Sequence, residues 1–358
     1  MKILVVGPSW VGDMMMSQSL YRTLRARYPQ AIIDVMAPAW CRPLLSRMPE
    51  VNEAIPMPLG HGALAIGERR KLGHSLRERR YDRAYVLPNS FKSALVPFFA
   101  NIPLRTGWRG EMRYGLLNDA RVLDKDAWPL MVERYVALAY DNGVMRCAKD
   151  LPQPLLWPQP LLWPQLQVNE GEKSQACSAF NLSYDRPIVG FCPGAEFGPA
   201  KRWPHYHYAA LAKKLIDDGY QIALFGSAKD NEAGKEIIAA LSSEQQAWCR
   251  NLAGETQLEQ AVILIAACKA VVTNDSGLMH VAAALDRPLV ALYGPSSPDF
   301  TPPLSHKARV IRLITGYHKV RKGDAAEGYH QSLIDITPER VLQELNELLA
   351  EKTEHEEA

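Results

Sequence analysis

The chain has 358 residues, of which 47% are hydrophobic and 22% are charged, so a globular protein of two domains is expected. Collagen-like, disordered and disulfide-scaffold classes are excluded by this composition. The formal net charge is only +2, which argues against a protein that binds nucleic acid through an overall positive charge.

The cysteines and the N-terminus indicate the compartment. Six cysteines are spread along the chain without a CxxC pair, which favours free thiols in a reducing environment. The apolar run at residues 3–6 is too short for a secretory signal, and no apolar run approaches the ~18 residues that cross a bilayer. A cytoplasmic location is therefore expected.

The first half of the chain begins with a strand–helix–strand pattern. Residues 2–6 are continuously apolar, as in a buried parallel strand, and the turn GPSWVGD follows. Apolar residues then recur at helical spacing as far as Pro29, namely Met16, Leu20 and Leu24. A second apolar run at 32–36 completes a unit with a right-handed crossover, and a further strand is expected at 83–87.

The middle of the chain carries a doubled hexapeptide, PLLWPQ, at 154–159 and again at 160–165. Regularly spaced proline excludes helix and sheet interior, so an extended linker is predicted at 153–170. A Pro-rich partner motif is the alternative. We expect a first domain at 1–170 that includes this linker, a second domain at 171–335, and a C-terminal helix with an acidic tail at 336–358.

The second half repeats the alternation of strands and helices. Strands are expected at 188–192, 221–225, 270–273 and 289–293, and helices at 208–218, 258–267 and 277–285. The last helix opens with Thr337, Pro338 and Glu339, which suit a cap and a first turn. Its apolar stripe is expected to pack back across the other domain. Two doubly wound α/β halves are therefore predicted.

Ligands of open α/β sheets bind beyond the carboxyl ends of the strands, so residues just after strands are the candidates. Asp13 lies in the turn after the first strand, where neither GxGxxG nor GxxxxGK[ST] is present. It is a candidate general base, or else it only caps the following helix. The helix terminus would lower the pKa of Asp13, and burial would raise it.

Two post-strand loops of the second half are candidate anion sites. The loop at 193–204 carries Lys201, which together with backbone amides could hold a diphosphate, although an ordinary exposed loop is the alternative. In TNDSGLMH, the amides of Ser276 and Gly277 would point out of a helix N-terminus. His280 follows one turn later and either reaches a phosphate or sugar oxygen or is a buried core histidine.

Other patterns are weaker. The loop at 293–298 lines the same site or is a plain turn. Asp124 and Asp126 form a DxD pair, but the lysine between them argues against a metal. Zinc-ligand spacing and the GxSxG pattern of hydrolases are absent from the sequence.

Three segments, KILVVGPSWVGDMMMSQSLYRTL, FCPGAEFGPAKRWP and TNDSGLMHVAAAL, resemble the bacterial lipopolysaccharide heptosyltransferases, and the resemblance covers nearly the whole chain. It implies the GT-B fold, with two Rossmann-like domains that face a cleft. It also implies inverting transfer of L-glycero-D-manno-heptose from ADP-heptose to the first heptose of the lipopolysaccharide inner core. The doubled hexapeptide is a departure, because a single copy is expected.

The resemblance also implies roles for individual residues. Asp13 matches the general base, and Lys201 matches a lysine that contacts the donor's phosphates. The donor-binding motif D-[ST]-G-x-x-H is matched by Asp275, Ser276, Gly277 and His280. Nucleotide-contacting loop positions correspond to Ala195 and Glu196, and an adenosine-ribose contact corresponds to Lys229 and Asp230. No cofactor and no essential metal are expected, because Lys201 and the helix terminus would replace a divalent cation.

A basic stretch at 61–113 contains eleven Lys or Arg against four Asp or Glu. The implied acceptor carries carboxylates and phosphates at an anionic membrane surface, which would suit these cations. Lys92 and Arg109 are the expected acceptor contacts, while a solvated helix face is the alternative for 69–83. We expect a monomer in the cytoplasm, peripheral on the cytoplasmic face of the inner membrane.

Three other functions stay open. A nucleotide-sugar epimerase of GT-B-like fold would need no separate acceptor. Another heptosyltransferase of the same family would use a different acceptor. A sugar- or nucleotide-binding protein of two α/β domains would hold the ligand without turnover.

Overall fold

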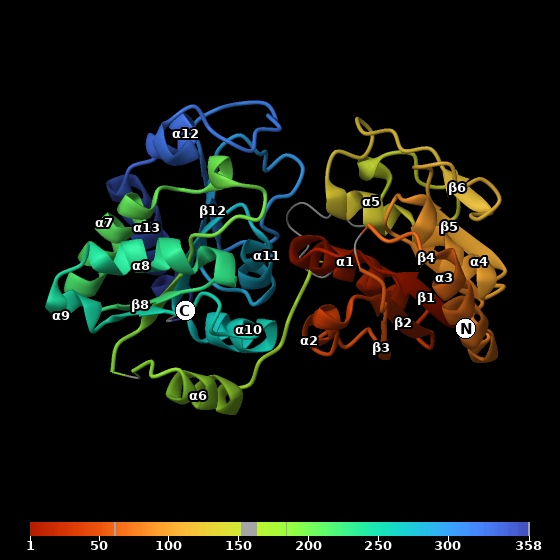
Figure 1. Ribbon diagram of the computed structural model, residues 1–358, viewed down its shortest axis with the longest axis horizontal. Coiled ribbons are helices and arrows are strands. Elements are labelled where there is room, and N and C mark those ends of the chain that lie inside the picture. The colour runs from red at the N-terminus through yellow and green to blue at the C-terminus, as the bar shows by residue number, and fades with distance from the viewer. Residues whose placement is uncertain (61, 152–162, 184, 357–358) are drawn as a thin grey trace. The chain divides into compact units, whose positions relative to one another are not determined.

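The computed structural model describes residues 1–60, 62–151, 163–183 and 185–356 (Figure 1). The chain forms two compact units, Met1–Pro164 and Gln165–Ala358. The division falls inside the second copy of the hexapeptide, whereas the sequence analysis placed the boundary at residue 170. Residues 154–162 of the doubled hexapeptide lie outside the described residues. Of the extended linker predicted at 153–170, residues 163–169 are described and are neither helix nor strand, and α6 begins at Glu170.

The first unit contains a six-stranded sheet in the order β3-β2-β1-β4-β5-β6, and all of its strand pairs are parallel. The strands are β1 (Lys2–Val6), β2 (Ile32–Ala37), β3 (Glu53–Pro56), β4 (Arg83–Val86), β5 (Leu104–Trp108) and β6 (Asp119–Arg121). The strands predicted at 2–6, 32–36 and 83–87 are confirmed to within one residue. The chain builds outward from β1 on one side and from β4 on the other, so the topological switch point lies between these two strands.

Helices cover both faces of this sheet (Figure 1). They are α1 (Val11–Arg27), α2 (Arg42–Leu45), α3 (Ile66–Leu76), α4 (Leu95–Phe99) and α5 (Met131–Ala137), with 3-10 turns η1 (Ala39–Cys41), η2 (Arg77–Arg79), η3 (Phe91–Ala94) and η4 (Ala148–Asp150). Leu4 and Val6 of β1 share a core with Leu76 of α3 and Val96 of α4. The alternate residue Val5 is also fully buried, and α1 packs against α5. Burial of both faces explains why β1 is continuously apolar.

The second unit has the same design, with a parallel sheet in the order β12-β11-β10-β7-β8-β9. Its strands are β7 (Ile188–Cys192), β8 (Gln221–Leu224), β9 (Cys249–Asn251), β10 (Ala270–Asn274), β11 (Leu289–Tyr293) and β12 (Ala308–Arg312). Its helices are α6 (Glu170–Ala179), α7 (His205–Asp217), α8 (Asn231–Ala239), α9 (Ser243–Gln246), α10 (Leu258–Ala267), α11 (Gly277–Ala284), α12 (Gln331–Ile334) and α13 (Pro338–Glu356), with 3-10 turns η6 (Pro199–Lys201), η7 (Ala228–Asp230) and η8 (Ala326–Gly328). The switch point lies between β7 and β10.

The apolar stripe of α13 is part of the core of the second unit. Val341 and Leu345 are fully buried together with Phe191 of β7 and Leu211 of α7. From the sequence, this stripe was predicted to pack back across the other domain. Within its own unit the helix contacts α7, β11 and β12, which supply the apolar partners of the stripe.

Two expectations from the sequence concerned the state of the cysteines and membrane-spanning segments. All six cysteines are free thiols, as predicted. Among the helices of the described ranges, none is both long enough and apolar enough to cross a membrane.

Candidate functional site

Within the second unit, the candidate residues gather at the carboxyl ends of β7, β8 and β10, around the switch point. The buried side chain of Asn274, at the end of β10, holds the β7 loop in place. Its Nδ2 donates to the carbonyl of Pro193 at 2.8 Å, and its Oδ1 accepts from the backbone N of Trp203 at 3.0 Å. Tyr208 Oη also donates to Asn274 Oδ1, at 3.2 Å. Asn274 was not predicted from the sequence, although it directly precedes Asp275 of the donor-binding motif.

Lys201 and Asp275, predicted separately, lie together. Lys201 Nζ donates to Asp275 Oδ2 at 2.7 Å. The exposed fractions of the two side chains are 19% and 9%, so the pair is largely removed from water. The lysine of the β7 loop is thus held, with its charge compensated, beside the N-terminus of α11.

The N-terminus of α11 has no side-chain cap. Ser276 is the N-cap residue in extended conformation, and its side chain makes no capping hydrogen bond. The first-turn amides from Gly277 onward are therefore not satisfied by a side-chain cap.

His280, on α11, is buried. Burial lowers its pKa to about 4, with Asp275 acting to raise that pKa and Lys201 to lower it further. The imidazole is therefore neutral above pH 5 and adds no charge to the site. Its contact with a donor stays a prediction.

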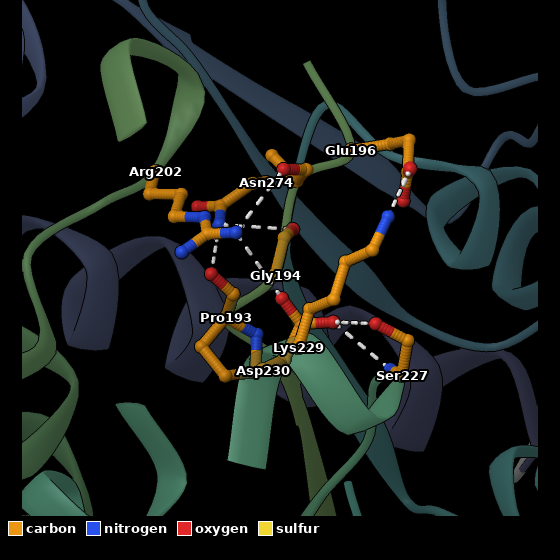
Figure 2. A network of polar contacts seen from close by, with 9 residues as sticks. Pro193, Gly194, Glu196, Arg202, Ser227, Lys229, Asp230 and Asn274 are labelled. Carbon is orange, nitrogen blue, oxygen red and sulfur yellow. Dashed lines mark hydrogen bonds and ion pairs between the residues drawn. The ribbon is translucent and has the colours of Figure 1, made fainter. Parts of the chain in front are cut away.

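A polar network joins the loops after β7 and β8 (Figure 2). The buried Asp230 carboxylate accepts from the backbone N and Oγ of Ser227, both at 2.9 Å, and from Arg202 Nη2 at 3.4 Å. Gly194 packs against the same carboxylate so closely that an added Cβ would lie 2.4 Å from Asp230 Cγ. Glycine at 194 is required by this close approach.

The outer part of this network is exposed. Lys229 Nζ donates to Glu196 Oε1 at 2.8 Å, and the ion pair raises the pKa of Lys229 (Figure 2). Ala195 is buried, and its carbonyl accepts from Arg202 Nη2 at 3.4 Å. The structure thus brings Ala195 and Glu196 to the same edge as Lys201, while nucleotide contacts by either stay predictions.

In the first unit, Asp13 lies in the first turn of α1, directly after β1. The N-cap residue is Trp10, and within the described residues Asp13 accepts no hydrogen bond and forms no ion pair. Burial raises the pKa of Asp13 to about 6. Desolvation therefore outweighs the helix terminus, and the carboxyl is suited to general-base work rather than to capping.

The loops after β4 and β5 are held together by Arg113, whose side chain is 1% exposed. Its guanidinium donates to the carbonyl of Pro88 at 2.6 Å, to Ser93 Oγ at 3.2 Å and to the carbonyl of Trp108. Burial lowers the pKa of Arg113 to about 10. These two loops carry the half-buried Lys92 and the exposed Arg109, the predicted acceptor contacts.

The basic stretch at 61–113 contains both arginines that bind within their own unit and cations that are exposed. Several of its arginines donate to backbone carbonyls of their own unit: Arg69 to Leu64, Arg77 to Phe99, and Arg105 to Leu116. Arg79 pairs instead with Glu53 at 2.5 Å. These side chains support the fold. Arg70 and Lys71 of α3 are exposed, as the alternative of a solvated helix face predicts, and acceptor binding by the stretch stays a prediction.

The weaker patterns acquire structural roles. Asp124 Oδ1 accepts from the backbone N of Asp126 at 2.9 Å, which closes a turn. Ser297 Oγ accepts from the backbone N of Asp299 at 3.1 Å in the loop after β11. Within the part of the chain that the structure describes, no three His, Cys, Asp or Glu side chains gather as metal ligands.

The model of glycosyltransferase family 9 (heptosyltransferase) matches residues 69–330. The chain belongs to this family. It is 88% identical to "Lipopolysaccharide heptosyltransferase 2" of Salmonella typhimurium, over 98% of this chain and 99% of that protein. The protein of the same name in Escherichia coli is 86% identical over the same shares.

A solved structure gives the same result. The E. coli ADP-heptose lps heptosyltransferase II superposes with a TM-score of 0.90 and 81% identity, covering 99% of this chain and 100% of that one. This match confirms the predicted fold class, two Rossmann-like α/β domains of the GT-B type. The resemblance drawn from the three segments is likewise confirmed, and this chain is a heptosyltransferase.

Proposed function

We propose that this heptosyltransferase transfers L-glycero-D-manno-heptose from ADP-heptose to the first heptose of the lipopolysaccharide inner core, with inversion. The observation that carries the proposal is the 88% identity, over nearly both full chains, to a protein named lipopolysaccharide heptosyltransferase 2. The E. coli relative of known structure is named as an ADP-heptose heptosyltransferase. The anion site at the start of α11 suits the diphosphate of such a donor.

Asp13 acts as the general base. As the acceptor hydroxyl oxygen bonds to the anomeric carbon, its proton passes to the Asp13 carboxylate. The bond from that carbon to the phosphate oxygen breaks, and its electron pair leaves with ADP. A carboxyl with a pKa of about 6 is mostly ionised at pH 7 and is still basic enough to take the proton.

The departing ADP is stabilised by Lys201 and by the amides of Ser276 and Gly277. Asp275 orients Lys201 through the 2.7 Å ion pair, and Glu196 and Ala195 lie beside the nucleotide. Because the lysine and the helix terminus meet the developing charge, we expect no essential metal and no cofactor.

The acceptor is bound by the first unit. Lys92 and Arg109 follow β4 and β5, at the same sheet edge as Asp13 after β1. A carboxylated and phosphorylated inner core supplies the anionic groups that these cations bind. We expect the enzyme to act as a monomer in the cytoplasm, peripherally at the inner membrane.

Mass spectrometry of a truncated inner-core acceptor that bears one heptose tests the proposal. Incubation with ADP-heptose, the protein and a chelator is expected to give a product heavier by one heptose. Alteration of the donor alone would instead indicate an epimerase, and transfer only to an acceptor without heptose would indicate another enzyme of the family. Bound donor without any turnover would indicate a binding protein.

A further inference from the structure

The charges of the donor loops compensate one another. Around the ends of β7, β8 and β10, three cationic side chains each pair with an acid: Lys201 with Asp275, Arg202 with Asp230, and Lys229 with Glu196. Side chains that carry three positive and three negative charges provide no net attraction for an anion. Positive charge in addition to these pairs and the start of α11 would stabilise an expelled diphosphate further, because the leaving group gains negative charge as its bond breaks.

A long loop after β12 lies against the β7 loop. The backbone N of Ala200 donates to the carbonyl of Arg321 at 3.3 Å. Gly198, with φ of +122°, approaches the same carbonyl so closely that a Cβ there would lie 2.5 Å from it. The residues next to Lys201 therefore fix the backbone position of Arg321 independently of its side chain.

Arg321 has a cationic side chain without an acidic partner. Its guanidinium is exposed, and over the described ranges it forms no ion pair and no side-chain hydrogen bond. It lies 5.5 Å from the centroid of the Phe197 ring, and Lys201 Nζ lies 5.4 Å from the same centroid. The two cationic groups are thus within about 11 Å of each other, on one aromatic side chain that is 41% exposed.

Arg312, in strand β12, is also cationic, but its donor groups are already engaged. Its guanidinium donates to the carbonyls of Gly294 and Gly316 and to Ser297 Oγ. These acceptors hold its donor groups within the fold, whereas those of Arg321 are available to a ligand.

We propose that Arg321 is a second phosphate-binding cation of the donor site, which binds the diphosphate of the sugar nucleotide opposite Lys201. The proposal rests on the proposed function, since it assumes a nucleoside diphosphate sugar as donor. Lys201 shares its charge with Asp275, so Arg321 adds a charge that no acidic side chain compensates and donor groups that are not engaged. A guanidinium can donate two parallel hydrogen bonds to a phosphate and keeps its charge at every working pH.

Calorimetric titration with ADP and with AMP tests this role. Arg321→Ala is expected to weaken ADP binding about tenfold and AMP binding less than twofold, since AMP lacks the second phosphate. The turnover number should fall at least tenfold, and Arg321→Lys should recover part of both losses. The matched control is Lys319→Ala, which removes the same charge from the same loop and should change each quantity less than twofold.

Three results would overturn the proposal. One is unchanged ADP affinity and turnover in Arg321→Ala. Another is an equal loss of ADP affinity and turnover in Lys319→Ala, which would indicate that the positive charge of the whole loop attracts ADP and not Arg321 in particular. The third is an equal loss for AMP and ADP at an unchanged melting temperature. These results differ from failure of the proposed function, in which the wild-type protein itself would not bind ADP.

Discussion

Lys201 Nζ and Asp275 Oδ2 form a 2.7 Å ion pair between the β7 loop and the end of β10, and both side chains are mostly buried. The pair joins two chain segments on either side of the switch point. It therefore serves both the fold of the second unit and the position of the lysine that we assign to the donor's phosphates. Its two roles can be separated by experiment.

Lys201→Met is expected to weaken ADP binding and to destabilise the protein by about 2 kcal/mol, because it leaves Asp275 ionised and unpaired in a largely buried position. The double variant Lys201→Met, Asp275→Asn should regain most of that stability and none of the ADP affinity. Urea unfolding and calorimetry measure the two effects. A double variant as unstable as the single one would show that the pair is not coupled.

Asp13→Asn is expected to lower transfer at least 100-fold, since the acceptor proton then has no base. ADP affinity should stay within twofold, because the donor residues belong to the second unit. Turnover at the wild-type rate in Asp13→Asn would refute the assignment of the base.

The same Asp13→Asn variant should be more stable than the wild type at pH 8. The pKa of Asp13 is raised in the folded state to about 6, so ionisation of the carboxyl costs the folded protein stability as pH rises through this range. Removing the charge should gain about 3 kcal/mol at pH 8 and almost nothing below pH 4. Urea unfolding at both pH values measures the difference, and a loss of stability at pH 8 would contradict the desolvation of Asp13.

The pH dependence of kcat/KM should report the same carboxyl. The value of kcat/KM is expected to be constant from pH 7 to 8. Below pH 6 it should fall about tenfold per pH unit, because Asp13 becomes protonated. His280 should not contribute, since its pKa of about 4 keeps it neutral throughout. The same fall is therefore expected in His280→Gln, and its disappearance there would assign the titration to the histidine.

Gly194→Ala should disturb the donor loops, because the new Cβ would lie 2.4 Å from Asp230 Cγ. The Asp230 carboxylate would have to leave Ser227 and Arg202, at a cost of about 2 kcal/mol, and the KM for the donor should rise. Gly67→Ala on α3 is the control, since a Cβ there meets no atom within 4 Å and should be neutral or stabilising. Equal melting temperatures for the two variants would contradict the close packing at residue 194.

The strands and the loops that carry the site could be predicted from the sequence, because burial on both faces makes a parallel strand such as β1 continuously apolar. What a polar side chain contacts could not be predicted in this way. Asn274 and Asp230 act through partners more than 25 residues distant, and their short motifs do not reveal those contacts. The apolar stripe of α13 was recognised, but which surface it covers depends on the tertiary packing of α7 and β11.

The contacts of the cationic side chains at 61–113 could not be predicted from the sequence either. The number of these side chains suggested binding of an anionic acceptor, and composition does not distinguish an arginine that meets solvent from one that meets backbone carbonyls. Arg69 and Arg113 are both almost completely buried, and each donates to carbonyl oxygens of its own unit. Lys92 and Arg109 stay candidates because they follow strands, not because the stretch is basic.

Arg113 tests whether acceptor binding depends on the arrangement of these loops. Arg113→Lys keeps the charge, but its single nitrogen cannot take the places of both Nη1, which binds Pro88 and Ser93, and Nη2, which binds Trp108. The loops after β4 and β5 should therefore separate. We expect the KM for the acceptor to rise about tenfold while ADP affinity is unchanged, with a loss of about 2 kcal/mol in stability. Arg70→Met, an exposed change on α3, should alter neither. If stability falls and the KM for the acceptor does not change, Arg113 only supports the fold, and the assignment of Lys92 and Arg109 to the acceptor loses its structural basis.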